Sequence, residues 1–565
     1  MKREATRVSP LAPLAWMLPI VVFALLAASN PREPGLYMDA ANPDYVSAWL
    51  ARGTLHIPSW IYTDNVLAGE YVYPLLNSLY GGNLPAYLAL LFFRTFGFGL
   101  EQMRYFHACF GVAVLLAVFW SMRQWRLPRL AVVPVLLLLA IDPNFVFAWR
   151  TQYYLQLVPL IFLFVGLGVL GRHKARLDAG EPAYRYLWLA GIFLGFAGYC
   201  YFTFAIYAAT IFTAYLFVTR RQASIFMTGW QLAIATLIGW SPFAYAHASI
   251  ALQAGWPAYL DTLRGLQTSY GVIDSSQASG LGRLATVGER VSYLFGARSM
   301  ASLLLGGNPI SPVLKWLHAL VLCLGLVFSV LTLPRAVRSS VGRSYLAADT
   351  WHAVGVLILA IMFGQLLLGL AIGKPLGLQH YIAILPALYV LTMLMFANLF
   401  AHGGQPLSAR GRWSVATGFV MFAAINIVLT SNLAKRLERD GGYGLYSEAI
   451  NLVAEQVKQA DPKDVLLFPQ WGYWMGVVTL TGPRHDAVQT LSLGEMVTKL
   501  RDEAWLKDRK SFLLVVGSFG LLSCVDPSSN AASFASQVNL KVESMTRNVG
   551  RDMNNEVLLV RLTRR

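Results

Sequence analysis

Charged residues are scarce in this chain. Asp, Glu, Lys and Arg together make up 13% of its 565 residues, whereas hydrophobic residues make up 56%. A soluble globular protein carries about 25% charged residues, because its surface must be wetted. The shortage excludes an ordinary soluble protein of this length and indicates that much of the surface contacts lipid.

Motifs for metals and nucleotides are also lacking. The four cysteines, at positions 109, 200, 323 and 524, show no Cys-x-x-Cys spacing, which argues against a zinc or redox site. The sequence has no Walker loop, no convincing dinucleotide fingerprint and no His or Cys set with metal-ligand spacing. We therefore expect no cofactor and no metal site, with a divalent metal requirement left open, and an ATP-driven pump is not indicated.

Acidic residues are outnumbered by basic ones, 29 against 45, so the formal net charge is +16. A basic balance of this kind often indicates a nucleic-acid partner. Here the basic residues lie in short loops between apolar runs, which is the pattern that membrane topology produces. Membrane lipids, and not nucleic acid, are the expected partner of these charges.

Long apolar runs, in contrast, are abundant. A helix needs about 20 mostly apolar residues to cross a bilayer. The sequence predicts an α-helical polytopic membrane protein with about eleven spans. They are expected near residues 12–28, 105–121, 130–141, 154–170, 186–200, 203–218, 226–246, 312–332, 352–372, 381–399 and 414–431.

The distribution of Lys and Arg predicts the orientation of these spans. With the N-terminus inside, the inner segments hold 17 Lys and Arg in 74 residues and the outer loops hold 10 in 163. The apolar run Leu84–Phe98 fits this pattern only as a helix in the outer interface, because a span there would move the basic turn Met122–Arg129 outside. We expect a multi-pass protein of the bacterial inner (plasma) membrane, with a cytoplasmic N-terminus and a periplasmic C-terminal region.

Two domains are expected. The transmembrane domain covers residues 1–431 and carries two long outer loops, 29–104 and 247–311, and residues 432–565 follow it. In this last region helical apolar spacing alternates with short runs of β-forming residues. The expected helices are Tyr446–Gln459 and Ser492–Trp505, and the expected strands are Val465–Phe468, Phe512–Val516 and Glu556–Arg561. This alternation predicts a small extracytoplasmic α/β domain.

Two carboxylates follow the first span in the first outer loop. Asp39 and Asp44 flank the dipeptide Asn42-Pro43. This dipeptide predicts a turn, because the residue before a proline is pushed out of the helical region. Asp44 is placed to cap a short helix, Tyr45–Ala51. Asp39 lies in an apolar setting and caps nothing obvious, so it is the stronger candidate for chemistry.

This region resembles the GT-C membrane glycosyltransferases, and within them the branch of protein O-mannosyltransferases and lipid A aminoarabinose transferases (glycosyltransferase family 39). The acid after the first span and the short helix that ends in Ala-Arg-Gly carry the resemblance. Further matches are Tyr73-Pro74, the stretch from Asn83 to Tyr87, Phe96-Gly97, Arg104 and the run Gln379–Pro386. The first 200 residues or so carry most of it. The family shows Asp-Glu or a single Asp at the acidic motif, whereas here Asp39 is followed by Ala40 and Asp44 comes five residues later.

The resemblance implies an inverting sugar transfer from a polyprenyl-phosphate donor to a lipid, glycan or protein acceptor on the outer face. A carboxylate, Asp39 or Asp44, would act as general base on the acceptor hydroxyl. The departing phosphate needs cations rather than a proton. The basic residues expected on the outer face, and therefore the candidate phosphate ligands, are Arg104, Arg150, Arg264, Lys374 and His380.

Two other functions remain open from the sequence. A transporter or flippase of lipid-linked sugars would place ionisable residues near the middle of the membrane, often in repeated halves. The predicted spans contain almost no charges, and no repeat is visible. A non-catalytic envelope assembly protein would use the outer domain alone, and it would tolerate Asp39→Asn.

Overall fold

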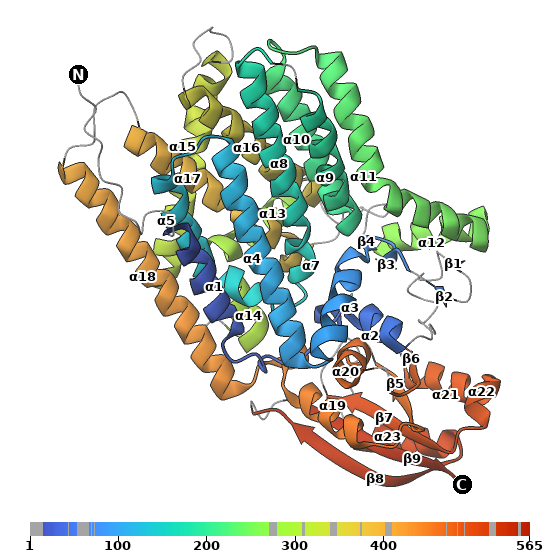
Figure 1. The fold of residues 1–565 in the computed structure, drawn as a ribbon. Helices are drawn as coiled ribbons and strands as arrows, with labels where there is room; N and C mark the ends of the chain where they lie inside the picture. The colour runs from blue at the N-terminus through green and yellow to red at the C-terminus, as the bar shows by residue number, and fades with distance from the viewer. Residues whose placement is uncertain are drawn as a thin grey trace, which may run out of the picture.

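The computed structural model of the chain describes residues 15–42, 44–52, 67–68, 71–72, 74–181, 183–269, 280–307, 311–339, 347–372, 376–401, 409–470, 472–482, 484–490, 492–518, 527–551 and 555–565. Long helices form a bundle, and a smaller part with a five-stranded sheet lies at one end of it (Figure 1). Cys524 and Lys374 lie outside the described residues.

Each predicted span coincides with a helix of the bundle. These helices are α1 (Leu18–Ala28), α4 (Leu100–Gln124), α5 (Arg129–Ala140), α8 (Pro159–Asp178, preceded by the short α7, Tyr154–Leu157), α9 (Arg185–Cys200), α10 (Thr203–Thr219), α11 (Ile225–Ala254), α15 (Pro312–Ser339), α16 (Ala347–Ala371), α17 (Leu385–Ala401) and α18 (Ala409–Asp440). By length and composition, six stretches of the described chain are able to cross a membrane: Leu100–Gln124, Tyr154–Asp178, Pro312–Thr332, Trp351–Ala371, Leu378–Asn398 and Trp413–Asp440. The prediction of a polytopic helical membrane protein is confirmed, and the count of eleven spans in part.

Small residues let two of these helices approach closely. A side-chain carbon added at Gly239 of α11 would lie 2.1 Å from the carbonyl oxygen of Ile192 on α9. One added at Gly195 of α9 would lie 2.2 Å from the carbonyl oxygen of Thr236. Apolar helices gain little from the hydrophobic effect inside lipid, so close backbone packing of this kind holds them together.

The first outer loop folds at the end of the bundle that faces the sheet (Figure 1). It contains a 3-10 turn η2 (Met38–Ala40), α2 (Asp44–Arg52), the short hairpin β3–β4 (Leu76–Ser78 and Gly81–Gly82) and α3 (Leu84–Phe96). The predicted interface helix is therefore a helix, and its Leu91 and Phe96 are exposed. The second loop carries α12 (Trp256–Ser269), α13 (Gly280–Phe295) and α14 (Ser299–Leu305).

The C-terminal part is an α/β domain with the strand order β6-β5-β7-β9-β8. Its strands are β5 (Val465–Phe468), β6 (Ala487–Gln489), β7 (Ser511–Gly517), β8 (Leu540–Val549) and β9 (Glu556–Arg564). Strand β5 runs parallel to β6 and β7, and β9 runs antiparallel to β7 and β8. Its helices are α19 (Ala449–Gln459), α20 (Trp474–Thr481), α21 (Leu493–Asp502), α22 (Ala504–Lys507) and α23 (Pro527–Gln537). All three predicted strands and both predicted helices are present, and the second helix is divided into α21 and α22. Helix α18 extends to Asp440, past the predicted domain boundary at residue 431.

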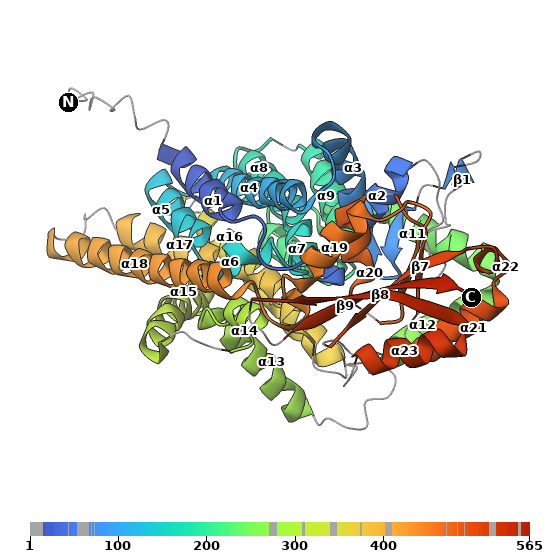
Figure 2. The same ribbon diagram turned by 90° about the horizontal axis from the view of Figure 1, so that it is seen from below.

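The two faces of the sheet serve different cores, since successive side chains of a strand point to opposite faces. Val465 and Leu467 of β5 belong to a separate cluster inside the C-terminal domain. Leu466 and Phe468 belong to the cluster that continues into the bundle. Seen from below, α19 and α20 lie between the sheet and the bundle (Figure 2), so the domain is built onto the first outer loop.

Candidate active site

Asp39 lies on η2, where the first outer loop meets the C-terminal domain. Its side chain is half-buried, and burial raises the pKa of this carboxyl to about 6, while a hydrogen bond with Tyr37 acts in the opposite direction. Helix α20 packs against η2, and the Tyr446 hydroxyl is within electrostatic reach of the Asp39 carboxylate. Asp39 is thus a partly accessible carboxylate with the raised pKa of a general base.

Residues of the C-terminal domain hold the segment that leads to Asp39. The backbone N–H of Gly35 donates to the Tyr446 carbonyl at 2.8 Å, and the N–H of Leu36 donates to Asn451 Oδ1 at 3.2 Å. The rings of Tyr37 and Tyr446 lie 5.4 Å apart between centroids. The sequence did not point to Tyr446 or Asn451, because about 400 residues separate them from the loop that they contact.

Asp44 has a different environment. It is fully buried at the start of α2, and its Oδ2 lies 2.6 Å from His107 Nε2. His107 Nδ1 lies 3.1 Å from the Trp149 carbonyl, which only accepts, so Nδ1 is the donor in this contact. The His107 ring also stacks on Tyr154 at 3.9 Å.

These contacts correct the expectation that Asp44 caps α2. Its Oδ1 has no hydrogen-bond partner among the described residues, and its Oδ2 faces His107. Asp44 is buried and paired, whereas Asp39 is partly accessible. The catalytic role of each carboxylate stays a prediction.

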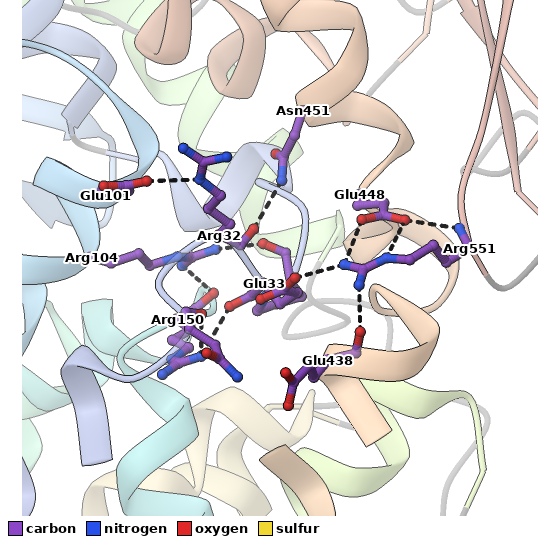
Figure 3. Close-up of polar contacts among 11 residues, drawn as sticks. Arg32, Glu33, Glu101, Arg104, Arg150, Glu438, Glu448, Asn451 and Arg551 are labelled. Carbon is purple, nitrogen blue, oxygen red and sulfur yellow. Dashed lines mark hydrogen bonds and ion pairs between the residues drawn. The ribbon is translucent and has the colours of Figure 1, made fainter. Parts of the chain in front are cut away.

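Arg104 and Arg150 bind the protein's own backbone (Figure 3). Arg104, 2% exposed, donates to the carbonyl oxygens of Arg150 and, at 3.0 Å, Pro34. Arg150, 3% exposed, donates to carbonyl oxygens in the last turn of α1 and in the loop after it. These are the oxygens of Leu26, Ala27, Ser29, Asn30 and Glu33. Buried guanidinium groups with these partners hold the loop that carries Asp39, and the phosphate contacts of both residues stay predictions.

The other predicted phosphate ligands have varied positions. Arg264 is exposed on α12 and pairs with Asp261 at 3.1 Å, and its phosphate contact stays a prediction. His380 is buried at the end of the 3-10 turn η4 (Leu378–His380), with Gln156 Nε2 3.5 Å from its Nδ1 and the Tyr201 ring 6.0 Å away. Lys374 lies outside the described residues.

Arg290, on α13, is a cation that the sequence did not single out. Its side chain is half-buried, and its Nε is buried without a hydrogen-bond partner in the described part of the chain. It lies within electrostatic reach of Tyr153 and Tyr381, and Tyr153 in turn interacts with Tyr446 beside Asp39. Tyr446 and Tyr153 therefore connect Asp39 electrostatically with Arg290. Its signal was weak, because Arg290 is one of several basic residues in the long second loop.

Among the described residues, no group of three or more His, Cys, Asp or Glu side chains is placed to hold a metal ion.

Comparison with known proteins gave structural likenesses alone. No family model matches the chain, and no curated protein matches it. Among solved structures, the chain is similar to an Archaeoglobus fulgidus oligosaccharyltransferase, with TM-score 0.49 and 13% identity over 90% of this chain and 70% of that one.

It is also similar to ArnT from Cupriavidus metallidurans. The structure bound to undecaprenyl phosphate gives TM-score 0.47 and 12% identity over 97% of both chains. The apo structure gives TM-score 0.43 and 12% identity over 97% of this chain and 98% of that one. The likeness to both kinds of neighbour is one of fold.

Proposed function

We propose that this protein is an inverting membrane glycosyltransferase that moves a sugar from a polyprenyl-phosphate donor to an acceptor hydroxyl at the outer face of the inner membrane. The observation that carries the proposal is Asp39, a half-buried carboxylate with a pKa raised to about 6. It lies where the bundle meets the α/β domain. The resemblance of the first outer loop to GT-C enzymes supports the same reading.

Asp39 would act as the general base. An acceptor hydroxyl loses its proton as its oxygen attacks the anomeric carbon, and a carboxylate within hydrogen-bond reach receives that proton. With a pKa of about 6, Asp39 is mostly ionised at pH 7 and is a stronger base than an exposed aspartate. Attack from the face opposite the phosphate inverts the configuration of that carbon.

Arg290 would stabilise the departing phosphate. The bond between the anomeric carbon and the phosphate oxygen breaks as the new bond forms, and negative charge grows on the phosphate. The Arg290 Nε has no hydrogen-bond partner among the described residues, and a guanidinium offers paired N–H donors of the geometry that phosphate prefers. Lys374 and His380 remain proposed contributors, because both lie in the sequence between α16 and α17.

Sugar transfer by the purified protein tests this proposal. A panel of radiolabelled polyprenyl-phosphate sugars is offered to wild type, Asp39→Asn and Asp44→Asn in lipid nanodiscs. Asp39→Asn is expected to lose transfer by at least about a hundredfold, the usual scale of general-base catalysis. It should keep its thermal stability at pH 7, because burial disfavours the charged form that the substitution removes.

The pH dependence supplies a second test. Transfer by wild type should fall as the pH drops through about 6, because protonated Asp39 cannot accept a proton. Arg290→Ala should weaken transfer strongly and Arg264→Ala, on exposed α12, should not. Absence of transfer from every donor, or full activity of Asp39→Asn, would refute the proposal.

A further inference from the structure

Arg551 joins three separate parts of the molecule (Figure 3). It follows β8 in the turn before β9. Its Nη2 lies 2.6 Å from Glu33 of the first outer loop, and its Nε lies 2.7 Å from Glu448 beside α19. It also donates to the backbone carbonyl of Glu438 near the end of α18. These carboxylates raise the pKa of Arg551, so its charge is permanent.

The segment Glu33–Tyr37 is held from two sides. From the bundle, Arg150 and Arg104 donate to the carbonyl oxygens of Glu33 and Pro34. From the C-terminal domain, Arg551 binds the Glu33 carboxylate, and the contacts of Tyr446 and Asn451 described above follow on the next residues. Asp39 comes two residues after this segment, so its place depends on anchors from both domains.

Ionic contacts dominate one edge of this junction. A cavity of about 760 Å³ lies between the start of α4 and α19, and Glu33 and Arg551 are part of its wall together with Arg32, Glu101 and Glu455. Arg32 and Glu101 form another pair across it at 2.8 Å. Phe98, Leu100, Leu452 and Leu480 also line this cavity, and the open space between the two walls leaves the ion pairs to bridge it.

We propose that Arg551 is a positioning residue for the transfer reaction: by binding Glu33 it fixes the segment Glu33–Tyr37 against the C-terminal domain and so sets the place of Asp39. This inference rests on the proposed function, and it assigns the β8–β9 turn a part in catalysis. The planar guanidinium explains why an arginine occupies this position. Its donors point in fixed directions toward Glu33, Glu448 and the Glu438 carbonyl, which a lysine ammonium cannot match.

The matched control lies on the same hairpin. Arg547 pairs with Glu556 of the neighbouring strand at 2.5 Å and is 67% exposed, but this contact stays inside the C-terminal domain. Arg551→Ala and Glu33→Gln each remove the ion pair between Arg551 and Glu33, which joins the two domains. Arg547→Ala removes an ion pair of similar kind that lies within the C-terminal domain. Glu33→Gln keeps the side-chain shape, so it serves if Arg551→Ala folds poorly.

Hydrogen exchange measures the coupling without any substrate. We expect the amides of Gly35 and Leu36 to exchange at least about tenfold faster in Arg551→Ala and Glu33→Gln, because local opening exposes them. The same amides should be unchanged in Arg547→Ala. Unchanged exchange in both junction variants would overturn the inference, whatever the protein transfers.

The pH profile of transfer separates positioning from a direct charge effect. The titratable groups that face Asp39 in the described chain are Tyr37 and Tyr446, and α20 carries none. Loss of an arginine alone would move the midpoint up, and loss of a glutamate alone would move it down. If the loss of either side chain exposes Asp39 to water, the midpoint of the pH profile falls below about 6 in both variants. In both variants kcat should also fall roughly tenfold, with the KM for the donor little changed.

Midpoints that move in opposite directions would refute positioning. If wild type transfers no sugar, the proposed function fails, and the exchange experiment still decides whether Arg551 holds the loop.

Discussion

Two aspartates five residues apart have opposite surroundings at the residue scale. Asp39 faces Tyr37 and is half-buried, and its raised pKa suits proton transfer. Asp44 is enclosed and lies within hydrogen-bond distance of His107. The difference arises from neighbours that are distant in the chain, His107 and Tyr446, and not from the local sequence.

Breaking the Asp44–His107 pair should destabilise the protein. Removing one partner leaves a buried polar group uncompensated, so Asp44→Ala is expected to lower the free energy of unfolding by about 3–5 kcal/mol. Thermal unfolding in detergent measures the loss. Because both side chains act in one contact, Asp44→Ala with His107→Ala should cost less than the sum of the single variants. An additive double variant would contradict an energetic coupling between Asp44 and His107.

Arg150 distinguishes a structural arginine from a substrate ligand. Arg150→Ala should lower thermal stability markedly, because several loop carbonyls lose a charged donor at once. Arg150→Lys should recover only part of the stability, since an ammonium lacks the fork of donors. If Arg150→Ala instead unfolds like wild type and raises only the donor KM, the phosphate role predicted from the sequence is supported.

At the scale of elements, the bundle depends on how closely its helices approach. The apolar runs decide that these segments are helices, because lipid offers no partner for a backbone N–H or carbonyl. Their mutual packing is decided by small residues such as Gly195 and Gly239, where the helix backbones nearly touch.

Gly239→Ala should separate α9 and α11. The new methyl group would meet the backbone of Ile192, which cannot move aside as a flexible side chain would. We expect a loss of about 1–3 kcal/mol, the usual cost of overpacking, seen as a lower temperature of thermal unfolding. Gly418→Ala is the control, because a side-chain carbon there meets nothing within 4 Å. Equal stability of the two variants would contradict this account of the packing.

At the scale of the whole molecule, the C-terminal domain and the bundle share one apolar core. Trp474 of α20 is fully buried, and its ring lies 5.3 Å from that of Tyr45 on α2. The side chains on one face of the sheet belong to this shared core. Those on the other face pack in a second core inside the C-terminal domain. The domain is therefore expected to unfold together with the bundle.

Trp474→Ala tests this cooperation. Replacing a buried tryptophan by alanine lowers the free energy of unfolding by about 3–5 kcal/mol. Trp474 packs against Tyr45 of α2, so the substitution weakens the contact between the C-terminal domain and the bundle. Calorimetry of wild type should show one unfolding transition, and Trp474→Ala should split it, with the C-terminal domain melting first. Two transitions already present in wild type would show that the parts unfold independently.

The sequence by itself determined the elements. Eleven apolar runs became helices of the bundle because their backbone groups must bond within the helix in lipid, and Val465–Phe468 formed a strand with the predicted bounds. The sequence singled out Asp39 as a candidate base, since its apolar setting left a carboxylate without a local structural use.

Only the tertiary structure decided what the charged groups do. Arg104, Arg150 and Arg290 looked alike as basic residues of outer segments, yet two bind the backbone, and the Nε of the third has no hydrogen-bond partner among the described residues. The contacts of Arg551 with Glu33 and of Tyr446 with Gly35 join residues more than 400 positions apart. A charged side chain acquires its role from burial and from partners, and long-range packing sets both, whereas helix and strand formation depends on neighbours along the chain.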